Sequence, residues 1–519
     1  MALSFAAMNF PLGRQDFRTL RRDGLRYVDK TEHLARVMGI NKYLFLARPR
    51  RFGKSLSVTT LKELHSGDRE LFDGLWAHEH WDFAAAHSTV IHLELSGLGY
   101  DALGVDAALR DFVHRTARRL GLSGHLSGAR DLQAQFAALL EAAAAASPSG
   151  QVALLVDEYD KPIVDYLDDP DRAEAHRDEL KRFYAVLKGA DAFLRLVFIT
   201  GVSAFGKVSV FSDLNNVTDL SLHPAAATLV GITERELDDN FAAELRAAAL
   251  PRERVRRWYN GYRFATAPTT ERVYNPWSLL SFLSSGELAS HWFETGTPTW
   301  LTRLVLRGGA YPLTGVRVKR ENLTAFDLRA IDPVAVLFQT GYLTIAAFDS
   351  EANVLALDYP NLEVRQAFES QLLRLLSPAS SASSLSQDLL YALRDGRIDR
   401  VAEIVDAALA GVPYPIWGHH PREAIFHMVV HLLLSASGAL AQSEVSSRRG
   451  RADVVAEAGQ RIYCFEFKRG VPARRAVQQI LERGYLDPYA HRGLRRVAVG
   501  MTFDAERRRL REWASEELP

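Results

Sequence analysis

The chain has 519 residues and a formal net charge of zero, with 47% hydrophobic and 24% charged residues, which is the composition of a globular protein of two or three domains. No uncharged apolar run reaches the roughly eighteen residues of a membrane span, and no basic segment precedes the short apolar N-terminus, which argues against a membrane helix and a secretory signal. A single cysteine, Cys464, excludes a disulfide framework and a cysteine-based zinc site, so we expect a reduced, cytoplasmic setting.

The N-terminal part of the chain alternates short apolar runs with helical patterns. The runs have strand length and lie at 42–47, 90–95, 152–156 and 194–200. Tens of residues with helical periodicity separate them, including an Ala-rich helix that ends in a turn-rich break at 142–150. This alternation predicts an α/β domain with a mostly parallel sheet, which we assign to residues 1–220.

The first apolar run leads into a loop that a helical pattern follows. Strand, loop and helix in this order form a phosphate site, because the N–H groups of the loop and helix N-terminus point at phosphate oxygens. Lys54 would reach the β- and γ-phosphates of ATP, and the Ser55 hydroxyl would bind Mg²⁺. Arg48 stands where the pattern G-x-x-x-x-G-K-[ST] has its first glycine. The predicted ATP-binding loop consists of Arg48, Pro49, Arg50, Arg51, Phe52, Gly53, Lys54 and Ser55.

Two acidic residues follow the apolar run at 152–156. Asp157 at the strand tip is expected to hold Mg²⁺ through water, and Glu158 to polarise the attacking water. The alternative is that acidic residues follow a buried strand only because the chain returns to solvent. The run at 194–200 leads into Thr200-Gly-Val-Ser203, where Thr200 and Ser203 either sense the γ-phosphate or belong to a plain turn.

A helix-rich pattern with scattered aromatic residues extends over 221–376. It includes WYNGYRF from Trp258 and YNPWSLLSFL from Tyr274. We predict a helical middle region that packs on the ATP-binding domain. The small-residue stretch at 377–386 is typical of a surface linker, so a third domain is expected at 387–519.

The third domain contains a carboxylate–lysine pattern on predicted strands at 452–457, 462–468 and 496–501. Asp453 lies in the first strand. Glu466 and Lys468 lie two residues apart in the second strand, so they share one face of it. A short hairpin through 457–460 would bring Asp453 alongside them.

These residue types suit phosphodiester cleavage, which needs a divalent cation, an activated water and neutralisation of charge at phosphorus. Asp453 and Glu466 supply hard oxygen ligands for Mg²⁺ or Mn²⁺. Lys468 would orient or deprotonate the water, or stabilise developing negative charge. Glu444 would complete the metal shell or tune the acid–base pair. The alternative interpretation is an exposed strand face with a cross-strand ion pair, because E-x-K tripeptides are common.

The C-terminal segment carries an excess of basic residues. Residues 421–519 include 17 Lys and Arg against 12 Asp and Glu. Such an excess is compatible with a nucleic-acid partner, and also with an ordinary solvated helix face. The residues that we expect to contact nucleic acid near the predicted centre are Arg451, Arg469, Arg474 and Gln479.

Together these motifs resemble a bacterial family that pairs an AAA-ATPase-like domain with a PD-(D/E)xK nuclease superfamily domain. The resemblance implies an α/β fold class with a P-loop NTPase core and parallel sheet, a helical middle region and a C-terminal restriction-endonuclease-like α/β domain. It also implies that RPRRFGK is the family's own form of the loop. The shared motifs occur in one order at Tyr27–Thr31, Arg48–Ser55, Leu155–Asp160, Thr200–Ser203, Asn215–Asn216, Tyr259–Tyr262, Tyr274–Trp277, Phe293–Pro298, Gln339–Leu343, Pro360–Val364, Gly450–Asp453, Glu466–Lys468 and Gln479–Ile480.

The leading hypothesis is an enzyme in which ATP binding and hydrolysis drive or gate Mg²⁺-dependent cleavage of DNA. A role in defence against foreign DNA, or in mobile-element biology, would suit such coupling. An alternative is a nucleotide-gated binding or signalling module whose nuclease-like tail recognises nucleic acid or protein without cutting. A third hypothesis is an oligomeric remodeller, and homo-oligomerisation is left open. The sequence does not decide whether ATP activates or restrains the tail.

Overall fold

The computed structural model describes residues 10–204, 210–212, 214, 216–292, 299–308, 313–323, 328–376, 382–412, 417, 422–447 and 450–518. Asn215, the motif at 293–298 and the first part of the predicted linker, 377–381, lie outside this part of the chain. The chain forms two compact units, one of Met1–Trp292 with Arg317–Leu362 and the other of Phe293–Val316 with Glu363–Pro519. The predicted middle region, 221–376, is thus divided between the two units.

Unit 1 is built on a five-stranded parallel sheet with the order β2-β3-β4-β1-β5. The predicted parallel sheet is confirmed, and each of the four apolar runs is one of its strands. The fifth strand, β5, was missed because its two residues are too few to show a period of two. The strands are β1 (Tyr43–Ala47), β2 (Thr89–Glu94), β3 (Val152–Asp157), β4 (Leu194–Gly201) and β5 (Thr218–Asp219).

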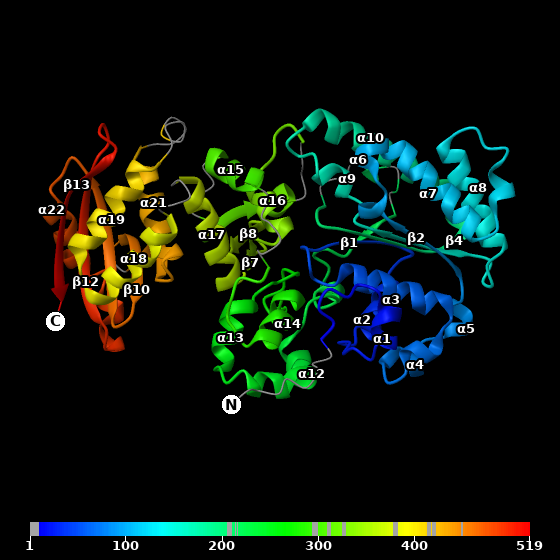
Figure 1. Ribbon diagram of the computed structural model, residues 1–519, viewed down its shortest axis with the longest axis horizontal. Helices are drawn as coiled ribbons and strands as arrows, with labels where there is room; N and C mark the ends of the chain where they lie inside the picture. Colours follow the sequence, from blue (N-terminus) through cyan, green and yellow to red (C-terminus); the bar gives the residue numbers. More distant parts are fainter. Residues whose placement is uncertain are drawn as a thin grey trace. The chain divides into compact units, whose positions relative to one another are not determined.

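Helices cover both faces of this sheet, as expected for parallel strands. Figure 1 shows α3 (Lys54–Ser66) on one side, and α7 (Val105–Arg119), α8 (Leu132–Ala145) and α10 (Pro170–Gly189) on the other. All six residues of β3 are therefore buried. The predicted helix end and turn at 142–150 are confirmed as the end of α8 and the turn before β3. The shorter helices are α1 (Phe17–Arg22), α2 (Thr31–Met38), α4 (Trp76–His80), α5 (Phe83–Ala86), α6 (Tyr100–Leu103) and α9 (Lys161–Val164).

The remainder of unit 1 is helical, as predicted, but it also contains a small sheet. Its helices are α12 (Glu234–Ala247), α13 (Arg252–Tyr259), α14 (Pro276–Ser285) and α16 (Pro333–Thr340). The sheet has the order β6-β8-β7, with β6 (Val316–Lys319), β7 (Thr344–Asp349) and β8 (Val354–Asp358). These strands were missed because a period of two over four to six residues is hard to distinguish from a helical pattern.

Unit 2 contains a mixed sheet with the order β13-β12-β11-β10-β9. Only β11 and β12 are paired in parallel, because the helix α22 (Ala473–Arg483) connects them. The three predicted strands are confirmed, whereas β9 and the exposed, charge-rich β13 were missed. The strands are β9 (Leu440–Ser447), β10 (Gly450–Ala458), β11 (Arg461–Arg469), β12 (Arg495–Asp504) and β13 (Arg509–Leu518).

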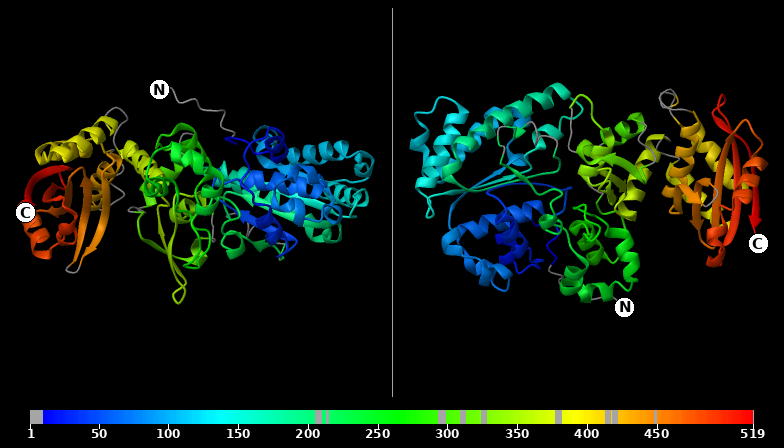
Figure 2. Two further views of the ribbon diagram at one scale, coloured as in Figure 1. Left: turned by 90° about the horizontal axis from the view of Figure 1, so that it is seen from below. Right: turned by 180° about the vertical axis from the view of Figure 1, so that it is seen from behind.

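Helices also cover both faces of the sheet in unit 2. Figure 2 shows α22 on one face, and α18 (Ala382–Asp395), α19 (Ile398–Ala410) and α21 (Arg422–Ala436) on the other. The unit also includes α15 (Thr299–Gly308) and α17 (Leu362–Leu376). Gly500 on β12 allows α22 to approach closely, since a Cβ there would lie 2.2 Å from the Ala473 carbonyl oxygen. Among the described residues, no helix is both long and apolar enough to cross a lipid bilayer.

Candidate nucleotide site and candidate nuclease centre

The carboxyl ends of three strands bring the predicted ATP-binding residues together. β4 lies between β1 and β3, and the register pairs Ala47 with Gly201. The loop after β1 therefore meets Thr200 at the end of β4 and Asp157 at the end of β3. Ligand sites in parallel sheets form at the carboxyl ends of the strands, because the loops that follow neighbouring strands leave the sheet at that end.

Lys54 begins α3 and points into the 48–55 loop. Its ammonium donates to the carbonyl oxygens of Arg48 at 2.9 Å and Pro49 at 3.0 Å. Burial lowers the pKa of Lys54, while the carboxylates of Asp157 and Glu158 act in the opposite direction. A buried ammonium that meets only loop carbonyls and nearby carboxylates is well placed to take phosphate oxygens as partners.

The eight loop residues divide into two groups. Arg50, Arg51, Gly53, Lys54 and Ser55 line a pocket of about 430 Å³. The guanidinium of Arg48 is instead buried, and it donates to the carbonyl oxygens of Ala47, Ser221 and Ala226 at 2.7 to 2.9 Å. Arg48 thus anchors the loop to the β5 side of the sheet. A glycine has no side chain that could do this, which explains why arginine stands at this position.

Phe52 and Pro49 also face away from the pocket. Phe52 is buried, and its ring packs edge-on against Tyr262 and Phe264 at centroid distances of 4.7 and 5.3 Å. Pro49 packs so closely on Gly341 that a Cβ there would lie 2.6 Å from the proline ring. The Y-N-G-Y-R-F and Q-T-G-Y-L motifs therefore support the back of the loop.

The acidic residues after β3 lie on the other side of the pocket. Asp157 is buried and accepts hydrogen bonds from the Thr200 hydroxyl and from the N–H of Glu158, the latter at 3.1 Å. Glu158 lines the pocket. Burial raises the pKa of the Glu158 carboxyl, and the neighbouring Asp157 raises it further.

Two pocket residues have left-handed backbone conformations without being glycine. Arg51 has φ 67° and Glu158 has φ 55°, and the described residues include only three other non-glycine positions with positive φ. Such conformations cost about 1 kcal/mol or more, and they cluster at functional sites. The conformation of Glu158 follows from its neighbours, because the N–H of Tyr159 donates to the Thr200 carbonyl oxygen at 3.0 Å.

Ser203 is not among the residues that line the pocket, and it binds a buried carboxylate instead. Asp160 is 1% exposed and accepts the Ser203 hydroxyl at 2.6 Å and the Ser203 N–H at 2.7 Å. Asp160 thus fixes the chain after β4. Of the two residues proposed to sense the γ-phosphate, Thr200 contacts Asp157, whereas the Ser203 side chain binds Asp160.

Two segments that were not predicted from the sequence to belong to the site complete the pocket. Residues 11–15 form one part of the wall, and Pro276, Trp277 and Leu280 of α14 form another. Asn275 caps α14 by accepting the Ser278 N–H at 3.2 Å, and proline occupies the first turn. The Y-N-P-W motif could have predicted the start of α14, because an Asn-Pro pair is typical of a helix N-terminus.

Trp277 contacts the loop directly. The Arg51 guanidinium carbon lies 4.0 Å from the centre of the Trp277 ring, which is a cation–π distance. The indole N–H donates to the His291 carbonyl oxygen at 3.2 Å, which fixes the ring in the wall of the pocket.

We expect Trp277→Ala to weaken ATP binding about tenfold, because it removes this wall and the aromatic partner of Arg51. Calorimetric titration with a non-hydrolysable ATP analogue measures the change. Trp258→Ala is the matched control, since it removes an indole from the same helical region outside the pocket. Equal binding by the two variants would contradict a ligand role for Trp277.

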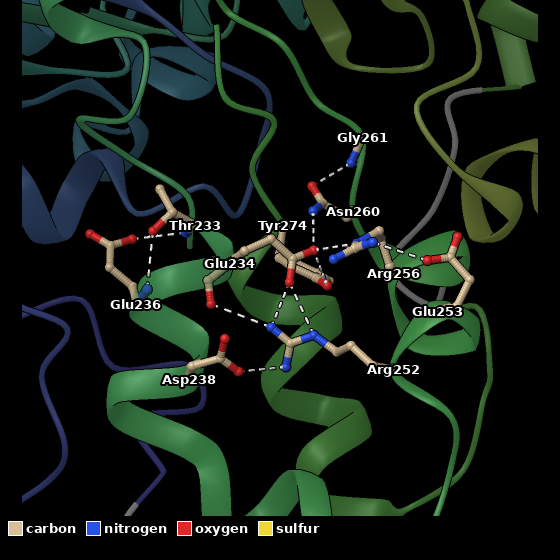
Figure 3. A network of polar contacts seen from close by, with 10 residues as sticks. All are labelled: Thr233, Glu234, Glu236, Asp238, Arg252, Glu253, Arg256, Asn260, Gly261 and Tyr274. Atoms are coloured by element: carbon tan, nitrogen blue, oxygen red, sulfur yellow. Dashed lines mark hydrogen bonds and ion pairs between the residues drawn. The ribbon is translucent and has the colours of Figure 1, made fainter. Parts of the chain in front are cut away.

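A polar network holds the helical wall in place (Figure 3). Glu234, at the start of α12, accepts hydrogen bonds from four side chains on three other segments. These donors are Arg252 at 2.5 Å, Arg256 at 2.8 Å, Asn260 at 2.9 Å and Tyr274 at 2.9 Å. Since Tyr274 belongs to the Y-N-P-W motif and Asn260 to Y-N-G-Y-R-F, one carboxylate joins both motifs to α12.

The network also reaches the N-terminal segment. Thr233 and Glu236 form a reciprocal capping box at the start of α12. Glu236 in turn accepts the ammonium of Lys30, from the Y-V-D-K-T motif, at 2.6 Å. The motif residues 27–31, 259–262 and 274–277 thus serve to position the wall of the candidate nucleotide pocket.

Glu234→Gln should lower the free energy of unfolding of unit 1 by about 1–3 kcal/mol. Partial burial raises the pKa of Glu234, but hydrogen bonds from Arg256, Arg252, Tyr274 and Asn260 outweigh it and hold the pKa at about 2. A lowered carboxyl pKa stabilises the folded state above the unfolded value of 4.5, and this contribution is lost as the pH falls toward about 2.

Chemical denaturation at several pH values tests this expectation. The difference between wild type and Glu234→Gln should be full above pH 4.5 and shrink below it. Glu253→Gln is the control, because Glu253 pairs with Arg256 on the surface and should change stability by no more than about 0.5 kcal/mol. A difference that is independent of pH would show that the charge of Glu234 is not what stabilises the wall.

Unit 2 brings the second predicted site together on one face of its sheet. The pairing of Val454 with Phe465 places Asp453 beside Glu466, and Asp453 Oδ2 accepts the Phe467 N–H at 2.7 Å. Lys468 Nζ donates to Glu466 Oε1 at 2.9 Å. The predicted hairpin is present, with Ala458 paired to Arg461.

The chemistry of these side chains fits a divalent cation. Glu466 is 2% exposed, and its Oε2 atom is buried without a hydrogen-bond partner in the described part of the chain. Burial raises the pKa of Glu466, as does Asp453, while Lys468 opposes them. A cation between Asp453 and Glu466 would satisfy the buried oxygen and relieve the repulsion between the carboxylates.

The described side chains supply two acidic ligands at this centre and no cluster of three. Glu444 lies on β9, and the β9–β10 register around Ala452 and Val454 brings it opposite Asp453. The side chain of Glu444 is outside the described part of the chain, so its predicted role stays a prediction.

The four predicted nucleic-acid contacts occupy different environments. Arg451, Arg469 and Arg474 are exposed. Gln479 is half-buried, and its amide donates to Glu466 Oε1. Gln479 therefore holds one oxygen of Glu466 from α22, so that the other oxygen stays available.

Comparison with known proteins agrees with this geometry. A family model described as "Predicted AAA-ATPase" matches residues 11–211, and one described as "PD-(D/E)XK nuclease superfamily" matches residues 421–513. The "Uncharacterized protein in vnfD 5'region" of Azotobacter chroococcum mcd 1 is 35% identical over 519 residues, which is 98% of this chain and 99% of that protein. No solved structure matches the chain. The first match includes Lys54 and Asp157, and the second includes Asp453, Glu466 and Lys468.

Proposed function

Because the chain belongs to a family that joins an AAA-ATPase-like domain to a PD-(D/E)XK nuclease superfamily domain, we propose that it hydrolyses ATP and uses the nucleotide to control metal-dependent cleavage of DNA. The observation that carries the nuclease half is Glu466, which shares one sheet face with Asp453 and Lys468 and has a buried Oε2 atom without a partner in the described chain. The 430 Å³ pocket at Lys54 supports the ATPase half.

In the nucleotide pocket, the loop and α3 bind and orient the phosphates of ATP. Lys54 exchanges its carbonyl partners for β- and γ-phosphate oxygens, and the N–H groups of Gly53 to Ser55 point at the same charge. Glu158 takes up a proton as a water oxygen attacks the γ-phosphorus and the bond to the β–γ bridging oxygen breaks. Ser55 and Asp157 would hold Mg²⁺, which neutralises charge on the phosphates when bound.

In the nuclease centre, Asp453 and Glu466 would hold a divalent cation, Mg²⁺ or Mn²⁺, which would neutralise charge on the scissile phosphate. Lys468 orients the attacking water molecule, or it stabilises the negative charge that develops on the phosphate oxygens during the attack. The water oxygen forms a bond to phosphorus, one P–O ester bond breaks, and the leaving oxygen takes a proton. Gln479 keeps Glu466 in position through its hydrogen bond.

The test is incubation of the whole protein with linear, circular and single-stranded DNA and Mg²⁺ or Mn²⁺, with and without ATP. Metal-dependent cutting whose rate changes with ATP supports both halves of the proposal. ATP hydrolysis without cutting of any substrate would overturn the nuclease half and favour a nucleotide-gated binding or signalling module. Light scattering with ATP separately tests homo-oligomerisation, and cell fractionation tests the expected cytoplasmic location.

A further inference from the structure

Basic side chains gather at one end of the sheet in unit 2, the end that carries Lys468. β11 and β12 are parallel, and Arg469 at the end of β11 pairs with Phe503 near the end of β12. The turn between β12 and β13 therefore lies just beyond Arg469. β10 is antiparallel to β11, so it begins at this same end with Arg451.

The β12–β13 turn is ordered by its own backbone. Asp504 Oδ1 accepts the N–H groups of Glu506 and Arg507, each at 3.0 Å, and Arg508 adopts φ 55°. Arg507 lies in the turn, Arg509 and Arg511 follow it on β13, and all three side chains are exposed. Because the turn is held in one conformation, these arginines are presented at small additional entropic cost.

One of these three arginines has an acidic partner in the described chain. Arg507 forms an ion pair with Asp504 at 3.9 Å and its side chain stays 70% exposed, whereas neither Arg509 nor Arg511 forms an ion pair with the described residues. At the opposite end of the sheet, Arg492 pairs with Glu457 at 2.9 Å and Arg495 with Glu517 at 3.9 Å. Arg509 and Arg511, which form no ion pair with the described residues, therefore lie at the end of the sheet that holds the candidate nuclease centre.

We propose that Arg507, Arg509 and Arg511 bind the phosphate backbone of DNA on one side of the cleaved bond, an inference that rests on the proposed function. Guanidinium groups bind phosphate with two parallel hydrogen bonds, which suits a rigid strand that presents several of them. β13 lies two strand spacings from β11, or about 10 Å. At a rise of about 3.4 Å per nucleotide, the turn contacts DNA about three nucleotides from the bond that Lys468 faces.

The experiment compares two triple variants of the full chain. Arg507→Gln, Arg509→Gln and Arg511→Gln together remove the proposed contacts, whereas Arg483→Gln, Arg492→Gln and Arg495→Gln remove three charges at the opposite end. Affinity for a DNA duplex is measured over a salt series without divalent metal. We expect the first variant to lose about 2.7 from the slope of log K against log salt, at about 0.9 per phosphate contact, and the control to keep the wild-type slope.

Cleavage kinetics separate this inference from the proposed function. The first variant should raise KM at least tenfold and leave kcat within about twofold, since the turn binds DNA away from the reacting phosphate. Unchanged binding and KM in the first variant, or equal losses in both variants, would overturn the contact. If no DNA is cut but the first variant alone binds weakly, the contact stands and the nuclease proposal fails. Arg511→Glu alone serves as a second variant should the triple variant not fold.

Discussion

Lys468→Ala is expected to reduce DNA cleavage at least about 100-fold while ATP hydrolysis continues at its normal rate. Lys468 is the cationic side chain within hydrogen-bond distance of Glu466, at 2.9 Å, and its own side chain is 28% exposed, so it can reach a phosphate. Its loss removes the positive charge that orients water or stabilises the phosphate oxygens. It also leaves the buried carboxylate of Glu466 without its ion-pair partner.

The readout is the single-turnover rate with saturating DNA and Mg²⁺. Glu466→Gln should have an effect of the same size, because the neutral amide is a poor ligand for a hard cation. Glu457→Gln is the matched control, since it removes a carboxylate from the neighbouring strand, where it pairs with Arg492. Cutting by Lys468→Ala at the wild-type rate would mean that Asp453, Glu466 and Lys468 form only a cross-strand ion-pair cluster.

Lys54→Ala is expected to abolish ATP hydrolysis, with a loss of at least about 100-fold in rate and weaker ATP binding. The Lys54 ammonium is buried and lies among loop carbonyls and the carboxylates of Asp157 and Glu158. Lys161, which begins α9 and also lines the pocket, pairs instead with Asp165, whereas the Lys54 ammonium meets the loop carbonyls.

Two further variants make this result specific. Lys62→Ala removes from the same helix, α3, a half-buried lysine that does not line the pocket, and should leave hydrolysis unchanged. Glu158→Gln should abolish hydrolysis but retain ATP binding, because the amide keeps the side-chain shape without accepting a proton. Phosphate release and ATP-analogue binding are measured together. Normal hydrolysis by Lys54→Ala would exclude the 48–55 loop as the phosphate site.

The effect of Lys54→Ala on DNA cleavage gives the sign of ATP control. Faster cleavage in this variant would mean that ATP restrains the nuclease, and slower cleavage would mean that ATP activates it. Cleavage at the wild-type rate would show that the two activities are independent. The comparison needs no knowledge of how the two units are arranged, since both activities are measured on the same chain.

Much of both sites followed from local sequence patterns. The strand, loop and helix at 43–66 are consecutive along the chain, so their order alone predicted where Lys54 would lie. Glu466 and Lys468 share a face because side chains in a strand alternate with a period of two. The Asp453 position followed from a hairpin with a two-residue connection, which leaves little freedom in register.

Other features depended on contacts between distant parts of the chain. Arg48 occupies a glycine position because carbonyl groups at Ser221 and Ala226 bind its guanidinium, more than 170 residues later. Ser203 binds Asp160, and Gln479 binds Glu466, although a serine after a strand and a glutamine beside basic residues would also suit a ligand site. Long-range packing determines which hydrogen-bond partner each of these side chains meets, and no local sequence pattern predicts it.

The sequence by itself determined the two domain types and the parallel sheet, and it singled out Lys54, Asp157, Asp453, Glu466 and Lys468 as candidate site residues. Each of these depends on residues that lie close together in the chain or at a fixed strand period. Only the tertiary structure decided that Trp277 and residues 11–15 form the wall of the candidate nucleotide pocket, and that Glu234 holds this wall in place. It also placed the β12–β13 turn beside Arg469, because strand order and register are fixed by long-range packing of the sheet against its helices.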